Sequence, residues 1–567
     1  MPAAVFLTAL AVRCAIVFQL DGTAIFRTPQ LDSVEYFSWA ERIASGDFSW
    51  PAAPPHGPGY PLFLALLLFI CRGSLFKVHL LQAILGSITA VMIAAIANRV
   101  AGEKAGLAAG VFAALYGPMA LVDVSIYGEG LLVFLITASL LAVIEAQHSV
   151  RRRAMLFFAG SALGLAIIVR PTAAILVPIY ALFVWRRSLL IFAVAVVLPV
   201  LPVLLHNWQT TGDLLAIQSG GGMNFSIGNS PQHDGTAWAR PGGTWDWLRG
   251  EAWRAGVRGA AAEDRYYLQR ALHELSPTLL VRKLIWLTQS EEIRDSHSFY
   301  FFTERSPVLR FAPRFSLLLP FAVFGLWMRR RSMPWLLAAS GIAMGLTIVA
   351  LVVGSRYRAP LLPFLVVFAG IGLASLIERR RIIAFAITFV LVFAITKVWT
   401  HAPSHALAEE WAMEGIALGK ERRIAEAGVA FTRANQLDPR LGIGWTGPGD
   451  LALSLGKLRE AEAAFQRSIA VDPHHARGYS HLGLVRAAEG DRATAIALLR
   501  RAVAIRYDRE AMYNLAGFLF AARDLSGAEQ LLREILRVDD SDVEVLTGLA
   551  RVAAEARQRS VSNRAKK

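Results

Sequence analysis

Cysteine is the residue that this sequence most clearly lacks. The chain of 567 residues contains only 2 cysteines. These are Cys14 and Cys71, and each lies within an apolar run. Two separated thiols in apolar surroundings exclude both a disulfide framework and a metal site built from cysteine.

Several sequence signatures of common enzymes are also missing. The Gly-rich stretch at 220–243 is not followed by Gly-Lys-Ser/Thr, which excludes a phosphate-binding P-loop. No ordered Ser-His-Asp set or metal triad stands out. The first apolar segment lacks a small-residue cleavage site and has Arg13 in its middle, so we expect a retained span rather than a signal peptide.

Charge is sparse and unevenly distributed. Hydrophobic residues make up 55% of the chain, charged residues only 18%, and the mean hydropathy is +0.45. Acidic residues are rare between 48 and 206, whereas about half of them follow residue 400. The composition therefore predicts an apolar, multi-span membrane body followed by a soluble C-terminal part.

The net charge of +15 does not indicate nucleic-acid binding. The basic residues form short runs between apolar segments, at 151–153, 185–187, 329–331 and 379–381. Such runs are typical of cytoplasmic loops, because Lys and Arg resist translocation.

Whether the number of membrane crossings before each basic run is odd or even decides on which side of the membrane that run lies. With the N-terminus inside, all four basic runs fall in the cytoplasm only if the short apolar run 60–71 does not cross the membrane. We therefore expect an interfacial helix at 60–71 and about eleven spans of roughly 20 residues. They are 4–20, 79–99, 105–123, 127–146, 154–170, 172–185, 188–206, 314–328, 333–353, 360–377 and 382–399.

This topology places three parts of the chain on the outer face, most simply the periplasmic side of a bacterial inner membrane. They are 21–78, 207–312 and everything after 399. Asp123, Glu129 and the segment 354–363 would meet them there. Charged side chains at membrane depth are costly, so those on this face are candidates for function.

A period of 34 residues runs through the C-terminal part. Asp-Pro pairs recur at 438–439 and 472–473. Large aromatic residues, glycines and small residues keep the same register, which is typical of tetratricopeptide repeats. We predict repeats at 408–441, 442–475, 476–509 and 510–542, a capping helix near 543–558, and a basic tail at 559–567. Such an array offers a binding surface for a protein partner, or else braces the membrane body.

The stretch LDSVEYFSWAERIASGDF at 31–48 contains the first candidate acid, Asp32. Locally, Asp32 and Glu35 have the spacing of a helix capping box, and this interpretation is favoured by the local sequence alone. A catalytic role for Asp32 requires partner cations on the same face of the membrane.

Those cations are expected in GSRYRAPLLP at 354–363. Arg356 and Arg358 flank Tyr357 at the outer end of a predicted span, and arginine forks match phosphate oxygens. The alternative is that they are interfacial anchors. Basic residues on the outer face are contrary to the positive-inside rule, and this favours a functional role for Arg356 and Arg358.

Three further residues have competing interpretations. Arg170 is either a second phosphate ligand or a helix-end arginine before Pro171. Glu129 is either a second site acid or an acid favoured in the first turn of a helix. His56 in PPHGPGYP has no second histidine nearby, which argues against a metal site.

Two outer segments have simpler interpretations. The Gly-rich stretch 220–243 is expected to be a surface loop, although such loops can shape a sugar pocket. The stretch 286–302 mixes acids, Arg and aromatic residues, and we expect an amphipathic interfacial helix there.

The ordered set of outer-face motifs resembles the GT-C superfamily of membrane glycosyltransferases, specifically bacterial relatives of the protein O-mannosyltransferases. The resemblance is carried by an arginine-containing first span followed by LDSVEYFSWAERIASGDF, then PPHGPGYPLFLALL, VDVSIYGEGLLVFLI and GSRYRAPLLPFL. It covers about residues 1–400. It implies an all-α fold with a membrane domain at 1–400 and a repeat domain at 401–558.

The resemblance also implies a function. The expected reaction is inverting sugar transfer from a polyprenyl-phosphate-linked donor to a protein, lipid or glycan acceptor on the outer face. Asp32 would be the base, and Arg356, Arg358 and Arg170 would bind donor phosphate. Glu129 would be a second acid, with Glu35, Tyr357 and His56 in support. Many relatives have two adjacent acids in the first loop, whereas Ser33 follows Asp32 here. We therefore expect no required metal or other cofactor.

Two other functions fit parts of the sequence. A non-catalytic scaffold would use the spans only as an anchor for the repeats, but about eleven spans exceed that need. A flippase or transporter would place ionisable residues in mid-membrane and often shows inverted repeats. The sequence shows no such internal symmetry, and most of the acids lie at the span edges.

Overall fold

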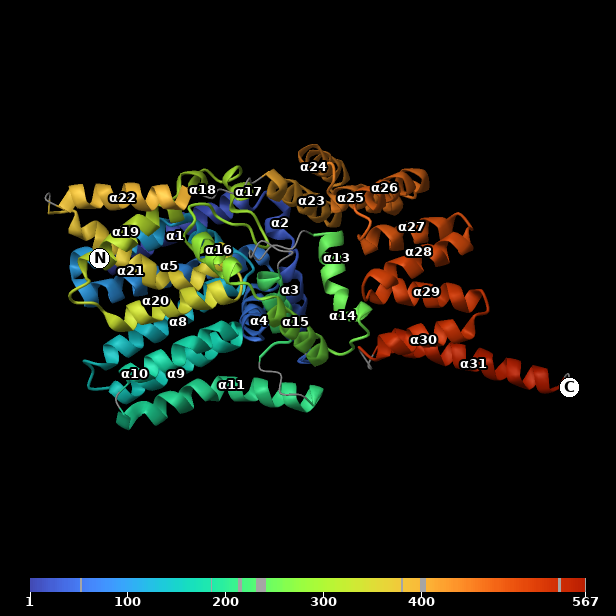
Figure 1. Cartoon of the computed structure of the whole chain (residues 1–567), viewed down its shortest axis with the longest axis horizontal. Helices are drawn as coiled ribbons and strands as arrows, with labels where there is room; N and C mark the ends of the chain where they lie inside the picture. The colour runs from blue at the N-terminus through green and yellow to red at the C-terminus, as the bar shows by residue number, and fades with distance from the viewer. Residues whose placement is uncertain are drawn as a thin grey trace. The chain divides into compact units, whose positions relative to one another are not determined.

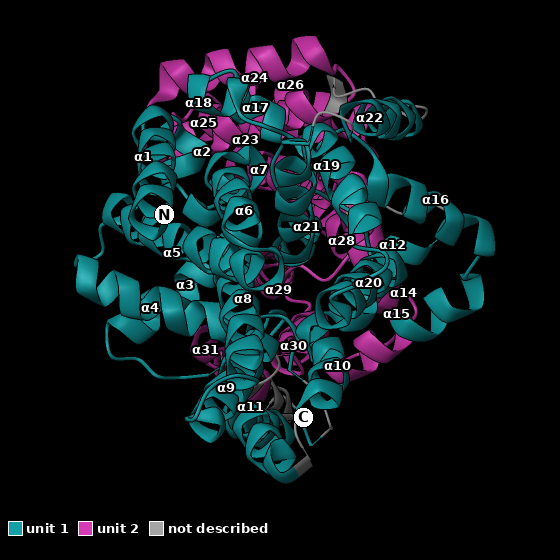
Figure 2. Cartoon of the chain, turned by 90° about the vertical axis from the view of Figure 1, so that its left-hand side faces the viewer, with its two compact units in different colours: residues 1–238, 268–402 teal, residues 239–267, 403–567 magenta. Residues whose placement is uncertain are grey.

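The computed structural model describes residues 1–50, 54–184, 186–212, 217–230, 241–378, 381–397, 404–538 and 542–565. Within these ranges the regular elements are helices, as the sequence predicts (Figure 1). The chain divides into two compact units. Figure 2 colours the first teal and the second magenta.

Unit 1, Met1–Trp238 with Leu268–Ala402, is the apolar body. Its long helices are apolar nearly all round, as helices surrounded by other helices or by lipid must be. Within the described ranges, six are long and apolar enough to cross a membrane, and the pair α6 and α7 passes the same test together with a 59° bend. The six are α1 (Pro2–Leu20), α5 (Leu75–Ala101), α8 (Gly128–Ala146), α9 (Arg152–Val169), α11 (Leu189–Thr211) and the stretch Arg356–Ser375; the pair is α6 (Glu103–Leu115) and α7 (Gly117–Val124).

The remaining predicted spans coincide with shorter apolar helices. They are η1 (Pro171–Ile175) with α10 (Leu176–Phe183), α19 (Phe315–Met328), α20 (Trp335–Ala350) and α22 (Ile382–Lys397). The expected interfacial segment forms the 13-residue helix α4 (Gly59–Cys71). The span count of eleven, and the interfacial position of α4, stay predictions. The apolar helices make this an integral membrane protein.

Two predicted outer segments differ from expectation. The amphipathic helix expected at 286–302 is wrong: α16 (Pro277–Thr288) ends early, residues 289–298 are irregular, and only α17 (Phe299–Thr303) follows. Buried polar contacts in this segment replace the helical backbone bonds. The Gly-rich segment is partly helical, as α12 (Gly221–Asn229), while 231–240 lies outside the described residues.

Unit 2 contains the repeat array, in the predicted register. Each repeat is a pair of helices, and the small and large residues of the period pack against each other. A β-carbon on Gly449 would lie 2.5 Å from the Phe465 ring, so the glycine lets the two helices of that repeat approach closely. The pairs are α23 (Ser404–Lys420) with α24 (Ile424–Leu437), α25 (Gly442–Ser454) with α26 (Leu458–Val471), α27 (Ala476–Ala488) with α28 (Arg492–Ile505), and α29 (Arg509–Ala521) with α30 (Leu525–Leu536).

The boundaries of the array differ from the sequence prediction in two ways. The final helix α31 (Val543–Ala565) continues into the segment predicted as a basic tail. Residues Ala239–Tyr267 also belong to unit 2, although the sequence assigns them to a loop of the membrane domain. They contain α13 (Gly243–Arg249), α14 (Glu251–Arg254) and the beginning of α15 (Ala260–Glu274).

Candidate active site

Asp32 is the first residue of α3 (Asp32–Ala44). The residue before it, Leu31, has φ 53° and ψ −130°, a conformation that side chains with a β-carbon rarely adopt. The N-cap is therefore Leu31, with no side-chain cap hydrogen bond, and the capping box predicted for Asp32 and Glu35 is wrong. The carboxylate of Asp32 instead accepts a hydrogen bond from Arg356. The local spacing of Asp32 and Glu35 carries no information about this distant partner.

Glu35 faces His56 instead of closing a cap. Its Oε2 atom lies 3.3 Å from His56 Nε2, and the His56 ring stacks at a tilt on Tyr36, with the ring centroids 4.8 Å apart. Gly57 makes this position possible: a β-carbon there would lie 2.4 Å from the carbonyl oxygen of Ile168. The segment PPHGPGYP thus packs directly on the end of α9, just before Arg170.

Arg170 and Glu129 meet between the end of α9 and the first turn of α8. The Nη2 group of Arg170 donates a short hydrogen bond to Glu129 Oε1. Glu129 is only 1% exposed, so the ion pair is buried. The Arg170 guanidinium also lies 5.4 Å from the ring centre of Tyr357.

Arg356 joins these groups to Asp32. It begins the short helix η3 (Arg356–Leu361), and its Nη2 group donates to Asp32 Oδ2 at 2.9 Å. Its Nε atom lies 3.5 Å from Glu129 Oε1. The guanidinium also lies 4.6 Å from the ring centre of Tyr127. The structure therefore brings Asp32, Glu129, Arg170 and Arg356 together in one cluster.

Asp295 completes the cluster and was not predicted. It lies in the irregular segment 289–298, and its Oδ2 atom makes a close ion pair with Arg356 Nε. The segment is held by Ser355, whose Oγ donates to Glu292 Oε2 at 2.7 Å and whose N–H donates to the Ile293 carbonyl. The unusual mixture of acids and aromatic residues at 286–302 was the available signal, but a helical interpretation obscured it.

The pKa shifts of Asp32 and Asp295 have opposite directions. Burial alone would raise the pKa of Asp32, but the Arg356 guanidinium, with His56 and Arg170, holds it well below its usual range. Burial raises the pKa of Asp295, and the neighbouring acids Asp32 and Glu129 add to this effect. Asp32 is thus held as a carboxylate, while Asp295 has a stronger tendency to bind a proton.

The guanidinium of Arg356 has capacity for one more ligand. It is 6% exposed, and among the described residues its Nη1 group has no hydrogen-bond partner. The same is true of Glu129 Oε2. Buried donors without partners are rare in native proteins. An anion with several oxygen acceptors would satisfy the free edge of Arg356.

The remaining predicted phosphate ligand, Arg358, lies apart from the cluster. Its guanidinium donates to the carbonyl oxygens of Trp286, at 2.6 Å, and Glu291, at 3.2 Å. It also packs over the Phe315 ring. These contacts fix the irregular segment to η3, so the geometry gives Arg358 a structural position rather than one facing a ligand.

A cavity of about 190 Å³ lies between α3 and residues 55–56. Trp39 contributes one wall, and its indole Nε1–H has no hydrogen-bond partner in the described part of the chain. Aromatic faces bordered by charged groups suit a polar ligand with an apolar face. The lining residues are Glu35, Tyr36, Ser38, Trp39, Arg42, Pro55 and His56.

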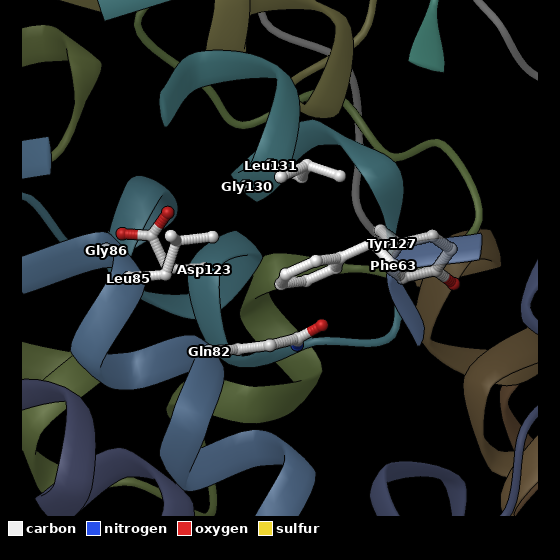
Figure 3. A pocket seen from close by; sticks show the side chains of 8 residues that line it. All are labelled: Phe63, Gln82, Leu85, Gly86, Asp123, Tyr127, Gly130 and Leu131. Atoms are coloured by element: carbon white, nitrogen blue, oxygen red, sulfur yellow. The ribbon is translucent and has the colours of Figure 1, made fainter. Parts of the chain in front are cut away.

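A second, much smaller cavity lies between α5, the end of α7 and the start of α8 (Figure 3). It has room for about one water, since its volume is about 10 Å³, and both Tyr127 and Asp123 line it. Asp123 is not free for chemistry, because its Oδ2 atom accepts hydrogen bonds from Arg13 Nε at 2.9 Å and Nη2 at 2.7 Å. Arg13 and Asp123 thus form a buried structural pair between α1 and α7.

No group of three or more His, Cys, Asp or Glu side chains that could hold a metal ion occurs in the part of the chain that the structure describes. The three carboxylates near Arg356 are arranged around that guanidinium.

In comparisons with known proteins, three segments of the chain match protein families. Residues 55–206 match the family described as dolichyl-phosphate-mannose-protein mannosyltransferase. Residues 448–475 and 486–552 match tetratricopeptide repeat families. The first match includes His56, Glu129 and Arg170 of the cluster region. No curated protein matches the chain.

Solved structures show weaker likenesses. Archaeal oligosaccharyltransferase AglB from Archaeoglobus fulgidus, in complex with an inhibitory peptide and a dolichol-phosphate, is 14% identical with a TM-score of 0.40, over 72% of this chain and 57% of that one. MamA from Desulfovibrio magneticus RS-1 is 18% identical with a TM-score of 0.22, over 30% of this chain and 94% of that one.

The family matches agree with the motifs in the sequence and with the two units of the structure. Residues 55–206 of the membrane domain match the dolichyl-phosphate-mannose-protein mannosyltransferase family, and an array of tetratricopeptide repeats follows this domain.

Proposed function

We propose that this protein transfers a sugar from a polyprenyl-phosphate-linked donor to a hydroxyl group of a protein or glycan acceptor, with inversion at the anomeric carbon. The reaction takes place on the outer face of the membrane, in a bacterium on the periplasmic side. The observation that carries the proposal is the Asp32–Arg356 pair, shared with Glu129 and Arg170 in a membrane domain of this family.

The donor phosphate would bind at Arg356 and Arg170. A phosphodiester oxygen arriving at the free Nη1 edge of Arg356 competes with the three carboxylates that now surround this guanidinium. Protonation of Asp295, which burial favours, lowers the negative charge that the phosphate must approach. The cations then face the oxygen on which charge develops when the bond from the anomeric carbon to phosphate breaks.

Asp32 would act as the base. In the resting site the Arg356 pair depresses its pKa and makes it a weak base. When donor phosphate takes over part of the guanidinium, Asp32 loses its strongest counter-charge, and its pKa rises. The acceptor hydroxyl, entering through the cavity at Trp39 and His56, gives its proton to Asp32. Its oxygen bonds to the anomeric carbon, and the lipid phosphate leaves as an anion.

Substitution of Asp32 tests this assignment. Asp32→Asn keeps the shape and one hydrogen-bond acceptor but removes the base, so transfer should fall by about 10²–10⁴-fold while the protein folds and inserts normally. The measurement is mass spectrometry of glycans and glycoproteins in a deletion strain that expresses each variant. Near wild-type transfer by Asp32→Asn would exclude Asp32 as the base.

The same strain separates the enzyme from a scaffold. A scaffold would tolerate Asp32→Asn and Arg356→Ala but would lose function on removal of the repeats. We also propose that transfer requires no divalent metal. Purified protein treated with a chelator should retain its rate, and restoration of lost activity by a divalent cation would contradict this proposal.

A further inference from the structure

We propose that the tetratricopeptide array takes residues 243–258 of its own chain as its ligand. The sequence places this segment in the long outer loop of the membrane domain, yet the structure packs it within unit 2. The array would therefore hold a loop of the enzyme to which it is fused, in the way that other arrays hold a partner peptide.

Two helices exchange capping carboxylates at this contact. The N–H group of Gly243, at the start of α13, donates to Asp472 Oδ2 at 2.7 Å. In return, the N–H group of Ala476, at the start of α27, donates to Asp246 Oδ2 at 2.9 Å. Each helix thus uses the other's acid for its unsatisfied N–H groups.

The exchange fills a gap in the array itself. The N-cap residue of α27 is His475, which makes no side-chain cap hydrogen bond. Later helices carry their own caps, from Asp491 for α28, Asp508 for α29 and Asp524 for α30. The earlier helices α24, α25 and α26 also have no side-chain cap hydrogen bond, but at α27 the carboxylate of Asp246 supplies one from the loop segment.

The repeat pattern changes at the site of contact. Asp-Pro occurs at 438–439 and 472–473, but 34 residues later the sequence is Arg506-Tyr507. Arg506 Nε lies 2.8 Å from Asp246 Oδ1, and the Tyr507 ring meets Trp253 edge to face. The two residues that depart from the repeat are therefore the ones that recognise the segment, as expected when a boundary is adapted to one ligand.

The contact continues along the array. Trp253 Nε1 donates to the Val503 carbonyl at 3.1 Å, and Arg254 Nη1 donates to the Ile505 carbonyl at 2.6 Å. Farther along, Arg258 Nε pairs with Glu534 at 3.3 Å. The segment thus reaches the second, third and fourth repeats in succession.

Two glycines let the segment approach this closely. A β-carbon on Gly243 would lie 1.9 Å from Asp472 Oδ1, and one on Gly250 would lie 2.0 Å from the Ile505 carbonyl oxygen. At Gly250 the obstructing atom is backbone, so any other residue would move the segment away, whereas a larger residue at Gly243 would make the Asp472 carboxylate shift. Complementary charge, complementary shape and the altered repeat all indicate the same occupant.

Hydrogen exchange of the full-length protein in detergent tests the proposal. In the wild type we expect slow exchange at backbone amides of 243–258. Arg506→Asp replaces the cation that pairs with Asp246 by another carboxylate and should raise their exchange rates at least 10-fold, a change in opening free energy of about 1.4 kcal/mol. Adding Asp246→Asn to Arg506→Asp removes the repulsion and should restore part of the protection.

Two controls make the result decisive. Glu529→Lys changes an exposed charge on α30 that pairs only with Arg533 in the described structure, and it should leave exchange at 243–258 unchanged. Circular dichroism verifies that Arg506→Asp keeps its helices, and Gly250→Val provides a purely steric second variant. Fast exchange of 243–258 in the wild type, or no change in both variants, would overturn the proposal. Sugar transfer is not part of this readout, so failure here leaves the proposed function standing.

Discussion

Arg356 is surrounded by more negative charge than it can neutralise. Asp32, Glu129 and Asp295 all approach one guanidinium, and Arg170 supplies the only other cation paired within the described cluster. A planar fork can serve several oxygens at once, whereas an ammonium group is a point charge. The arrangement therefore depends on arginine specifically, not on positive charge alone.

This dependence predicts that Arg356→Lys is not conservative. The variant keeps the charge but loses the fork, so we expect transfer efficiency (kcat/KM for lipid-linked donor) to fall by roughly 100-fold, in line with the loss of one preorganised charge contact. The measurement is steady-state transfer in detergent micelles.

Arg358→Lys is the matched comparison for this variant. Arg358 binds backbone carbonyls and faces no cavity of the cluster, so its substitution should lower the melting temperature and leave the KM for donor close to the wild-type value. A larger KM effect for Arg358→Lys than for Arg356→Lys would contradict the assignment.

The depressed pKa of Asp32 predicts the pH dependence of transfer. A carboxyl whose pKa is held below its usual range is ionised at every pH above that range, so it gives no titration near neutrality. The profile of kcat/KM, which reports the free enzyme, should show no rising limb between pH 5 and 8 from this group. A limb that persists in the wild type and disappears in Asp32→Asn would refute the pairing with Arg356.

At the residue scale, four of the five members of the ion-pair cluster could be predicted from the sequence, and the fifth, Asp295, could not. Asp32, Glu129, Arg170 and Arg356 could be anticipated because each lies near the outer end of a predicted span. Asp295 could not, because it lies on irregular backbone whose position is set by Ser355 and Glu292 rather than by local periodicity. The cap predicted for Asp32 failed for a similar reason, since a distant arginine engages its carboxylate.

At the scale of elements, small residues decide how closely the apolar helices approach. Gly86 of α5 faces the ion pair between α1 and α7. A β-carbon there would lie 2.4 Å from Asp123 Oδ2 and 2.7 Å from Arg13 Nε. The glycine therefore lets three helices share one buried pair of charges.

Gly86→Ala should separate this pair. Breaking a buried ion pair leaves uncompensated charge and costs about 3–5 kcal/mol, so we expect a clear loss of thermal stability in detergent. Gly22→Ala is the control, because nothing lies within 4 Å of a β-carbon at that position. Equal melting temperatures for the two variants would mean that the pair adapts to the added methyl group.

Elements were predicted most accurately where a period constrains them. The repeat helices follow the 34-residue register closely, because the residues that recur with this period specify the packing contacts of each repeat. Apolar spans were located from composition, but helices such as α19 and α20 are shorter than a membrane crossing requires by length alone. The segment 243–258 carries no period, so its place in unit 2 could not be anticipated.

At the scale of the whole molecule, the contact between 243–258 and the array should respond to pH. Burial raises the pKa of Asp246 to about 6 from its ordinary value of 3.8, with help from Asp472 and Asp508, and this outweighs the opposing effect of Arg506. The docked form therefore binds a proton more tightly than the undocked form. Asp246 therefore stabilises the docked form at low pH, and this contribution to stability is lost as the pH rises through about 6.

Comparison with Asp246→Asn isolates this effect, because other titrating groups cancel. The stability of the wild type relative to the variant should increase by up to about 3 kcal/mol as the pH falls from 7 to 4. Thermal unfolding of both proteins at several pH values measures the difference. A difference that is constant, or that grows as pH rises, would contradict the raised pKa.

The exchange of caps between α13 and α27 also defines what can be transplanted between proteins. A chimera that takes residues 403–567 alone would carry a third repeat whose first helix has lost its cap and whose Arg506 has lost its acid. The smallest portable module is discontinuous: the array together with 239–267. A transplant that preserves the contact must therefore carry both segments of the chain.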